Sequence, residues 1–133
     1  MRLLVTLLII LLLALPSSVL AGEFVRQVNH VRVERDLERV AQDHDWKACA
    51  DRAARRFRRQ GYIEHPTSCA QRIANEYGLA GENLAMAWSI KRCIRAFLRH
   101  PSHRTVLLGD WDYITVGSAL DREGYTYFVV LFH

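Results

Sequence analysis

The residues of this chain best suited to chemistry are His65, Glu82 and His103. They occur in three short motifs: Gly-Tyr-Ile-Glu-His-Pro, Gly-Glu-Asn-Leu-Ala and Pro-Ser-His-Arg. Two neutral imidazoles and a carboxylate suit zinc or copper, with a fourth position left to water. Because their spacing is not that of a compact His-Glu-x-x-His helix, only the fold can bring them together. We expect the three side chains to share one shallow polar site.

This site has two interpretations. In the first it is a binding cleft to which His100 also belongs, and His65 and His103 are the metal ligands. In the second, Glu82 orients the rings of His65 and His103 in a hydrogen-bonded cluster that ties the sheet to the loops. His100 alone is typical of an exposed helix end, where a cation is favourable.

A hydrolytic site would need a nucleophile or a metal-activated water beside Glu82 or His103. Ser68 and Ser102 are nearby in sequence, but they are typical of loop and helix-cap serines. No Ser-His-Asp or Cys-His arrangement has a supporting spacing. The sequence therefore favours a binding protein over an enzyme.

Residues 1–21 are typical of a secretory signal peptide. Arg2 precedes an apolar block from Leu3 to Leu15 whose one polar residue is Thr6, and Val19-Leu20-Ala21 supplies small or moderate residues before a cut at Gly22. The block is shorter than the roughly 20 residues of a membrane-spanning helix. We expect a secreted or periplasmic protein with no membrane span after cleavage.

Residues 22–133 are enough for one domain and too few for two. The full chain has 18 Lys and Arg against 14 Asp and Glu, a formal net charge of +4. Proteins that bind nucleic acids usually carry a stronger imbalance and a recognisable motif. We expect a monomer that has no nucleic-acid partner.

Three cysteines are present, Cys49, Cys69 and Cys93. An oxidising compartment allows one pair to close into a disulfide, which leaves one thiol over. Cys49 lies on the apolar stripe of a predicted helix, as a small buried side chain does. Cys69 and Cys93 are then the favoured pair, although the sequence does not fix the connectivity.

Helical spacing recurs along much of the chain. Nothing from Glu23 to Gln42 is Gly or Pro, so local propensity alone would allow an unbroken helix there. An amphipathic helix follows, with Asp43 as its N-cap and an end near Gly61. Further helices are expected over Cys69–Tyr77 before Gly78, over Ile90–Arg99 after a Ser89 cap, and from Pro101 onward.

Four arginines, Arg52, Arg55, Arg56 and Arg59, lie on the polar face of the helix before Gly61. Such a face would suit docking to an anionic lipid, glycan or nucleic acid. A solvated helix face explains it as well, and we prefer that simpler interpretation from the sequence alone.

The last part of the chain changes to a period of two. Residues alternate over Tyr113–Leu120 and Tyr125–Phe132, and Asp121–Gly124 forms the turn of a β-hairpin. Because two strands alone are marginally stable, Gly81–Ala85 is the candidate third strand. The predicted fold is α+β, an α-β-α sandwich with a small three-stranded antiparallel sheet.

Several motifs also occur in a set order over nearly the whole of residues 22–133: Asn29 with Arg32, Gly61–His65, Gly81–Ala85, Phe97 with Pro101–Arg104 and Leu107-Leu108, and Val116-Gly117. In this order they resemble the CAP superfamily, or SCP domain, of cysteine-rich secretory, antigen-five and pathogenesis-related proteins, in particular its bacterial branch. The resemblance implies an α-β-α sandwich, and a loop near residues 36–42 in place of continuous helix. It also implies that His65, Glu82 and His103 converge in a cleft.

The chain departs from the family pattern at three places. The second acid of eukaryotic members has no counterpart, and His100 or Arg99 stands there. Val106 occupies a position where bacterial relatives often have Asn, and Phe97 replaces the usual Trp.

The resemblance implies binding in place of catalysis for much of the family. We therefore expect a secreted, non-enzymatic module whose cleft takes a metal ion such as zinc, or a lipid, glycan or protein ligand. The alternatives are a metal-assisted, peptidase-like hydrolase, and a structural or host-interaction protein.

Overall fold

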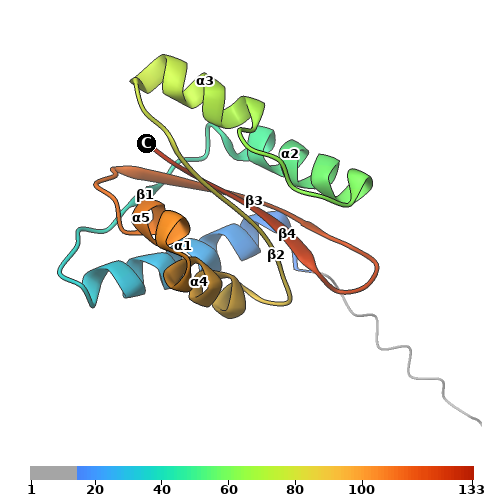
Figure 1. The fold of residues 1–133 in the computed structure, drawn as a ribbon, viewed down its shortest axis with the longest axis horizontal. Coiled ribbons are helices and arrows are strands. Elements are labelled where there is room, and N and C mark those ends of the chain that lie inside the picture. The colour runs from blue at the N-terminus through green and yellow to red at the C-terminus, as the bar shows by residue number, and fades with distance from the viewer. Residues whose placement is uncertain (1–14) are drawn as a thin grey trace, which may run out of the picture.

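The computed structural model describes residues 15–133, so most of the predicted signal peptide lies outside the described residues. Within them, no helix is both long and apolar enough to cross a bilayer. The elements in chain order are α1 (Ser17–Val33), β1 (Ala41–Gln42), α2 (Lys47–Gln60), α3 (Ser68–Tyr77), β2 (Gly81–Ala87), α4 (Ile90–Arg99), α5 (Pro101–Leu107), β3 (Tyr113–Leu120) and β4 (Thr126–Phe132) (Figure 1).

The sheet is built around the predicted hairpin. Its strand order is β1-β3-β4-β2, with β3 and β2 each antiparallel to β4. The three predicted strands are confirmed. The sheet has a fourth strand, the two-residue β1, which pairs in parallel with β3 and is too short for any periodic signal. Strand β2 is left at an edge of the sheet.

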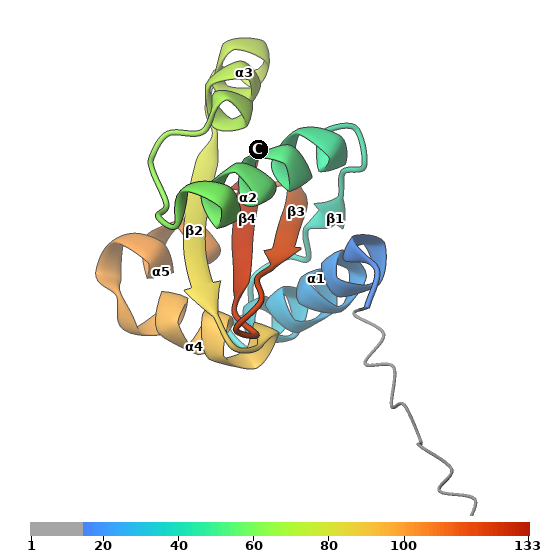
Figure 2. The same cartoon turned by 90° about the vertical axis from the view of Figure 1, so that its right-hand side faces the viewer.

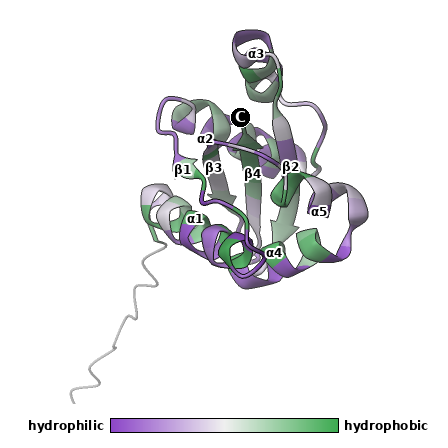
Figure 3. Cartoon of the chain, turned by 90° about the vertical axis from the view of Figure 1, so that its left-hand side faces the viewer, coloured by the Kyte–Doolittle hydropathy of each residue, from purple (hydrophilic) through white to green (hydrophobic). Residues whose placement is uncertain are grey.

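Helices cover both faces of the sheet, which confirms the α-β-α arrangement (Figures 1 and 2). Helices α2 and α3 pack on one face, and α1, α4 and α5 pack on the other. Each face has its own apolar core, with Phe57 and Ile73 in the first and Phe24, Phe97 and Phe128 in the second. Hydrophobic residues accordingly gather along the strands, whereas the helices mix hydrophobic and hydrophilic residues (Figure 3).

Most predicted helix ends are confirmed. Gly61 and Gly78 end α2 and α3 in the left-handed conformation, at φ 82° and 85°. The Ser89 side chain accepts a hydrogen bond from the backbone N–H of Arg92 and caps α4, and Pro101 begins α5. The chain leaves helix α1 at Val33, and residues 37–40 are a loop, so the implied loop is confirmed against simple propensity.

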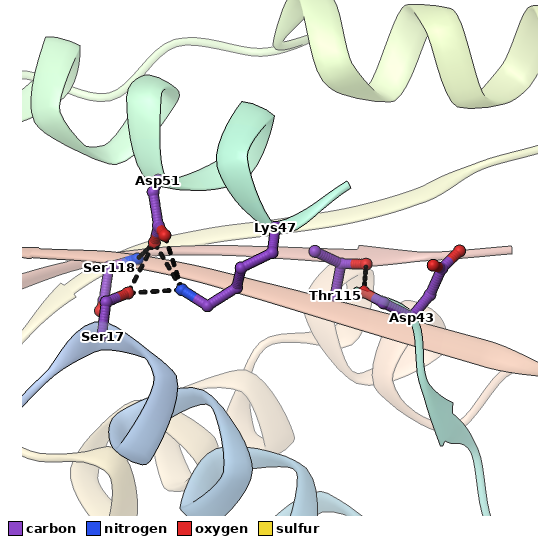
Figure 4. Close-up of polar contacts among 6 residues, drawn as sticks. All are labelled: Ser17, Asp43, Lys47, Asp51, Thr115 and Ser118. Atoms are coloured by element: carbon purple, nitrogen blue, oxygen red, sulfur yellow. Dashed lines mark hydrogen bonds and ion pairs between the residues drawn. The ribbon is translucent and has the colours of Figure 1, made fainter. Parts of the chain in front are cut away.

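The prediction that Asp43 is an N-cap is wrong, because α2 begins four residues later, after Trp46. Asp43 instead fastens the loop to the sheet. Its backbone carbonyl accepts a hydrogen bond of 2.8 Å from the Thr115 hydroxyl (Figure 4), and its carboxylate lies 2.8 Å from His133 Nε2. The chain therefore needs an extended segment at Asp43 before the helix can start.

A second polar cluster ties α2 to its neighbours (Figure 4). Lys47 and Asp51 form an ion pair of 2.7 Å, with side chains about 15% exposed. Asp51 also accepts hydrogen bonds from the Ser118 backbone N–H at 3.0 Å and the Ser17 hydroxyl at 2.7 Å. The predicted cut before Gly22 falls inside α1, so it would remove the Ser17 contact and leave the contacts of Asp51 to Lys47 and Ser118.

The favoured pairing of Cys69 with Cys93 is wrong. Cys49 and Cys69 form the disulfide, with a Cα–Cα distance of 5.9 Å, and Cys93 is a buried free thiol. The reason is the sheet, since Cys49 and Cys69 belong to the core under α2 and α3 whereas Cys93 belongs to the core on the opposite face. Burial raises the pKa of the Cys93 thiol above its usual range, which keeps it protonated and unreactive.

The Cys49→Ser/Cys69→Ser variant is expected to lose about 2 to 4 kcal/mol of unfolding free energy, because the bridge limits the unfolded chain. Urea unfolding followed by tryptophan fluorescence measures this loss. Cys93→Ser retains the bridge and serves as the control for reductant sensitivity. If reductant lowers the midpoint of the double variant as much as that of the parent protein, the assigned pairing is wrong.

Candidate functional site

The Glu82 carboxylate is held in place on edge strand β2. Its side chain is 7% exposed, and it accepts hydrogen bonds from the backbone N–H and the hydroxyl of Thr67. Its Oε1 lies 2.8 Å from Nδ1 of His65, whose side chain is 50% exposed. A carboxylate only accepts hydrogen bonds, so His65 donates from Nδ1, and Nε2 is the nitrogen that a neutral ring leaves free.

His103 is held by a different residue, Asn83. The imidazole Nδ1 of His103 lies 2.9 Å from Asn83 Oδ1, and Asn83 Nδ2 donates at 2.9 Å to the backbone carbonyl of His103. The amide oxygen is therefore the acceptor, and His103 also donates from Nδ1. The Phe97 ring packs against His103 with its centroid at 5.2 Å, so phenylalanine gives the imidazole aromatic support.

The interpretation in which Glu82 orients both histidines is therefore correct for His65 and wrong for His103. Successive side chains of a strand point to opposite faces, so Glu82 faces the α3 side and Asn83 the α5 side. The two histidines are held from the two faces of the edge strand. Thr67, which holds the Glu82 carboxylate, and Asn83, which holds the His103 imidazole, were missed as site residues. The period of two in strand β2 contains the signal for Asn83, whereas Thr67 lies outside the strand.

The donor set fits a metal ion only in part. Both histidines present a free Nε2, which is a normal ligand for zinc. The Glu82 carboxylate is engaged by Thr67 and His65, and in residues 15–133 no three His, Cys, Asp or Glu side chains are grouped to hold a metal. A zinc ion at this site would be held by His65 and His103, with water in its remaining positions. The bound ion would supply Lewis acidity at an open site.

The pKa of His103 is lowered by burial, and further by the repulsion that His100 and His65 exert when they are protonated. The His100 ring meets that of His103 edge-on, at a centroid distance of 5.8 Å. His100 is itself exposed, so its contribution is electrostatic. This environment keeps His103 neutral near pH 7 and its Nε2 free to accept.

We expect the His100→Gln substitution to raise the pKa of His103, because it removes a nearby positive charge. An NMR titration of the ring protons measures this change. Because the folded pKa of His103 lies below the unfolded value of about 6.5, its contribution to stability is complete above that pH and is lost as the pH falls toward the folded pKa. An unchanged or lower pKa in the variant would contradict the proposed coupling.

With the site's geometry established, comparison with known proteins shows the family. The family model described as CAP, the cysteine-rich secretory protein family, matches residues 25–132. The chain belongs to this family. None of the curated proteins compared with the chain matches it.

Solved structures show the same CAP fold. An outer surface protein of Borrelia burgdorferi is 25% identical with a TM-score of 0.72, over 84% of this chain and 89% of that one. An extracellular protein with an SCP domain from Bacillus anthracis is 18% identical, with a TM-score of 0.71 over 87% of this chain and 40% of that one. A cysteine-rich secretory protein of Staphylococcus aureus is 15% identical, with a TM-score of 0.66 over 87% of this chain and 38% of that one. This chain thus spans about two fifths of the last two proteins.

The CAP domain also has an open groove between α1 and α4, which we call the α1–α4 groove. It has a volume of about 510 Å³, within the range of small-molecule sites. Its lining comprises Arg26, Gln27, His30, Val31, Lys91, Ile94, Arg95 and Leu98. No local pattern in the sequence marks this groove, because it depends on how two helices distant in sequence pack side by side.

Proposed function

We propose that this CAP protein is an extracellular, non-enzymatic binding domain whose α1–α4 groove takes an amphiphile with an aliphatic chain and an anionic headgroup. The observation that carries the proposal is the groove's combination of an apolar surface with cationic side chains. The sequence left metal, lipid, glycan and protein ligands open, and this combination of surfaces favours a lipid. The extracellular and outer-surface descriptions of the Bacillus and Borrelia relatives support the proposed location.

The apolar part of the groove suits an alkyl chain. Ile94 is buried, while Val31 and Leu98 are partly buried and belong to the margin of the core beneath α1 and α4. These side chains therefore form an apolar surface that is continuous with the core but is still partly exposed in the groove. Covering such a surface with methylene groups is worth about 0.8 kcal/mol per buried CH₂.

The distribution of ion pairs around the groove favours the α4 side for the headgroup. Across the groove on α1, Arg26 pairs with Glu23 at 2.6 Å and His30 lies 3.1 Å from Glu34. Lys91 and Arg95 on α4 form no ion pair within residues 15–133. They stand four residues apart and so share one face of the helix. A carboxylate or phosphate group would find its unneutralised partners there.

Support for a non-enzymatic role comes from the serines nearest the histidines in sequence. Among the hydrogen bonds of the described residues, none joins Ser68 or Ser102 to His65 or His103. A serine nucleophile needs such a base within hydrogen-bond reach. The histidines instead direct their Nδ1 protons toward the strand.

The test is a titration of the purified protein with the fluorescent fatty acid cis-parinaric acid. The Lys91→Gln/Arg95→Gln variant is expected to bind about 10-fold to 100-fold more weakly, because charge-assisted hydrogen bonds to the headgroup are lost. Arg92→Gln/Arg99→Gln changes the charge of the same helix equally and is expected to bind normally. Equal losses in both variants would refute the site, and so would an absence of binding to the parent protein.

A second candidate function is weak zinc binding, favoured by the two free Nε2 atoms of His65 and His103. Calorimetry with zinc chloride is expected to give heat with the parent protein and none with His65→Ala/His103→Ala. His30→Ala/His44→Ala removes two exposed histidines elsewhere and serves as the control. Equal heats in parent and site variant would remove this candidate.

A further inference from the structure

A second groove, on the opposite face of the sheet from the α1–α4 groove, is walled by arginines. It lies between α2 and α3 and has a volume of about 260 Å³. Arg52, Arg56 and Arg59 come from α2, and Arg72 comes from α3. We call it the arginine groove. Its other lining residues are Cys49, Ala53, Thr67 and Ser68.

These arginines have acidic neighbours at one end only, where Asp45 and Glu76 line an adjoining pocket with Arg52 and Arg72. None of the four forms an ion pair in the described part of the chain. The single acid of α2, Asp51, is already paired with Lys47. Arg72 instead lies over the Trp46 ring, 5.1 Å from its centroid, which fixes its position at the groove without cancelling its charge.

The arrangement also costs the helix stability. Arg56 lies four residues from Arg52 and three from Arg59, and like charges at these spacings destabilise a helix. The disulfide between Cys49 and Cys69 joins α2 to α3 at the groove and so holds the two walls together. An external polyanion would pair with these guanidinium groups and so relieve the repulsion between them.

We infer that the arginine groove binds an anionic polysaccharide, a linear chain that carries sulfate or carboxylate groups. Arg52 and Arg59 are separated by about 10 Å along the helix axis, roughly the length of two sugar rings. Planar guanidinium groups pair with such anions through two parallel hydrogen bonds. Successive arginines along α2 would thus contact successive anionic groups of one chain.

The shape and chemistry of the groove favour a glycan over other polyanions. It is concave, and its apolar lining residues are only Cys49 and Ala53, so it offers no large side chain to insert into a bilayer surface. Single-stranded nucleic acids are usually held by aromatic side chains on which bases stack, and the groove is lined by none. A sulfated or carboxylated sugar chain needs charge and hydrogen-bond donors, which the arginines supply.

The test uses a heparin-derived oligosaccharide as a sulfated probe, with binding followed by calorimetry. The Arg52→Gln/Arg56→Gln/Arg59→Gln variant is expected to bind on the order of 100-fold more weakly than the parent protein. Arg39→Gln/Arg92→Gln/Arg104→Gln removes the same charge from exposed positions elsewhere and is expected to stay within about 3-fold of the parent. The groove variant is also expected to unfold at the same or a higher urea concentration, because arginine repulsion is relieved.

Equal losses in the two triple variants would overturn the inference, since they would show attraction by net charge alone. Binding to vesicles of phosphatidylglycerol, or to a single-stranded oligonucleotide, more tightly than to the sulfated glycan would overturn it as well. The inference is independent of the α1–α4 groove. The Lys91→Gln/Arg95→Gln variant tests the α1–α4 groove through cis-parinaric acid binding. That variant is expected to bind the glycan as the parent protein does.

Discussion

Replacement of Arg32 by methionine is expected to lower the free energy of unfolding by about 3 to 5 kcal/mol, the combined cost of several unsatisfied buried carbonyls. Arg32 is 2% exposed. Its guanidinium donates to the backbone carbonyls of Glu38, Leu107 and Gly109 at 2.8 to 3.0 Å. Methionine fills much of the same space but donates no hydrogen bond. A loss of this size is a large part of the 5 to 15 kcal/mol typical of a domain.

The same substitution is expected to disturb the histidine site. Arg32 holds the exit of α5 through Leu107 and Gly109, and His103 lies on that helix. Urea unfolding measures the stability loss, and the NMR signal of His103 reports the change at the site. Arg35→Met, an exposed change just past the end of the same helix, is expected to cost no more than about 0.5 kcal/mol. Similar losses in both variants would show that the buried bonds of Arg32 contribute little.

Gly117→Ala is expected to destabilise the protein strongly, because among the glycines position 117 has the shortest contact to an added Cβ. A Cβ at position 117 would lie 2.2 Å from the backbone carbonyl carbon of Ala50 and 2.4 Å from its oxygen. Helix α2 would have to move away from strand β3. Overpacking of a dense core usually costs about 1 to 3 kcal/mol, and we expect at least the upper end because the obstructing atoms are backbone atoms.

Two further variants make this prediction specific. Ala50→Gly/Gly117→Ala removes the Ala50 methyl group but leaves the two nearest backbone atoms, so it is not expected to restore stability. Leu120→Ala, at an exposed position of the same strand, controls for general effects on β3. A Gly117→Ala protein with an unchanged urea midpoint would show that α2 can shift without loss.

The helices and the hairpin could be predicted because their signals are local. Gly61 and Gly78 mark helix ends by the backbone conformation they allow, and Ser89 marks a helix start by its side-chain cap. Alternation over Tyr113–Leu120 and the following strand predicted the hairpin, although both strands are buried along nearly their whole length because helices cover both faces of the sheet. These features depend on residues that are neighbours in the sequence, so the sequence alone is enough to predict them.

The predictions that were wrong concern features that depend on which face of the sheet an element covers. The cysteine pairing required knowing that α2 and α3 share one face while Cys93 lies under the other. The role of Glu82 had the same dependence, because its neighbour Asn83 faces the opposite side and takes over His103. Neither the α1–α4 groove nor the convergence of Arg72 with the α2 arginines has a local signal.

The most direct test of the proposed binding function is a map of amide chemical shifts recorded while the labelled protein is titrated with palmitate. The proposed function predicts that the perturbed amides follow Val31, Lys91, Arg95 and Leu98, along both walls of the α1–α4 groove. It also predicts that amides of α2 and α3, on the far face of the sheet, stay unchanged. Perturbations confined to the histidine site or spread over α2 would contradict the proposal that this groove is the lipid site.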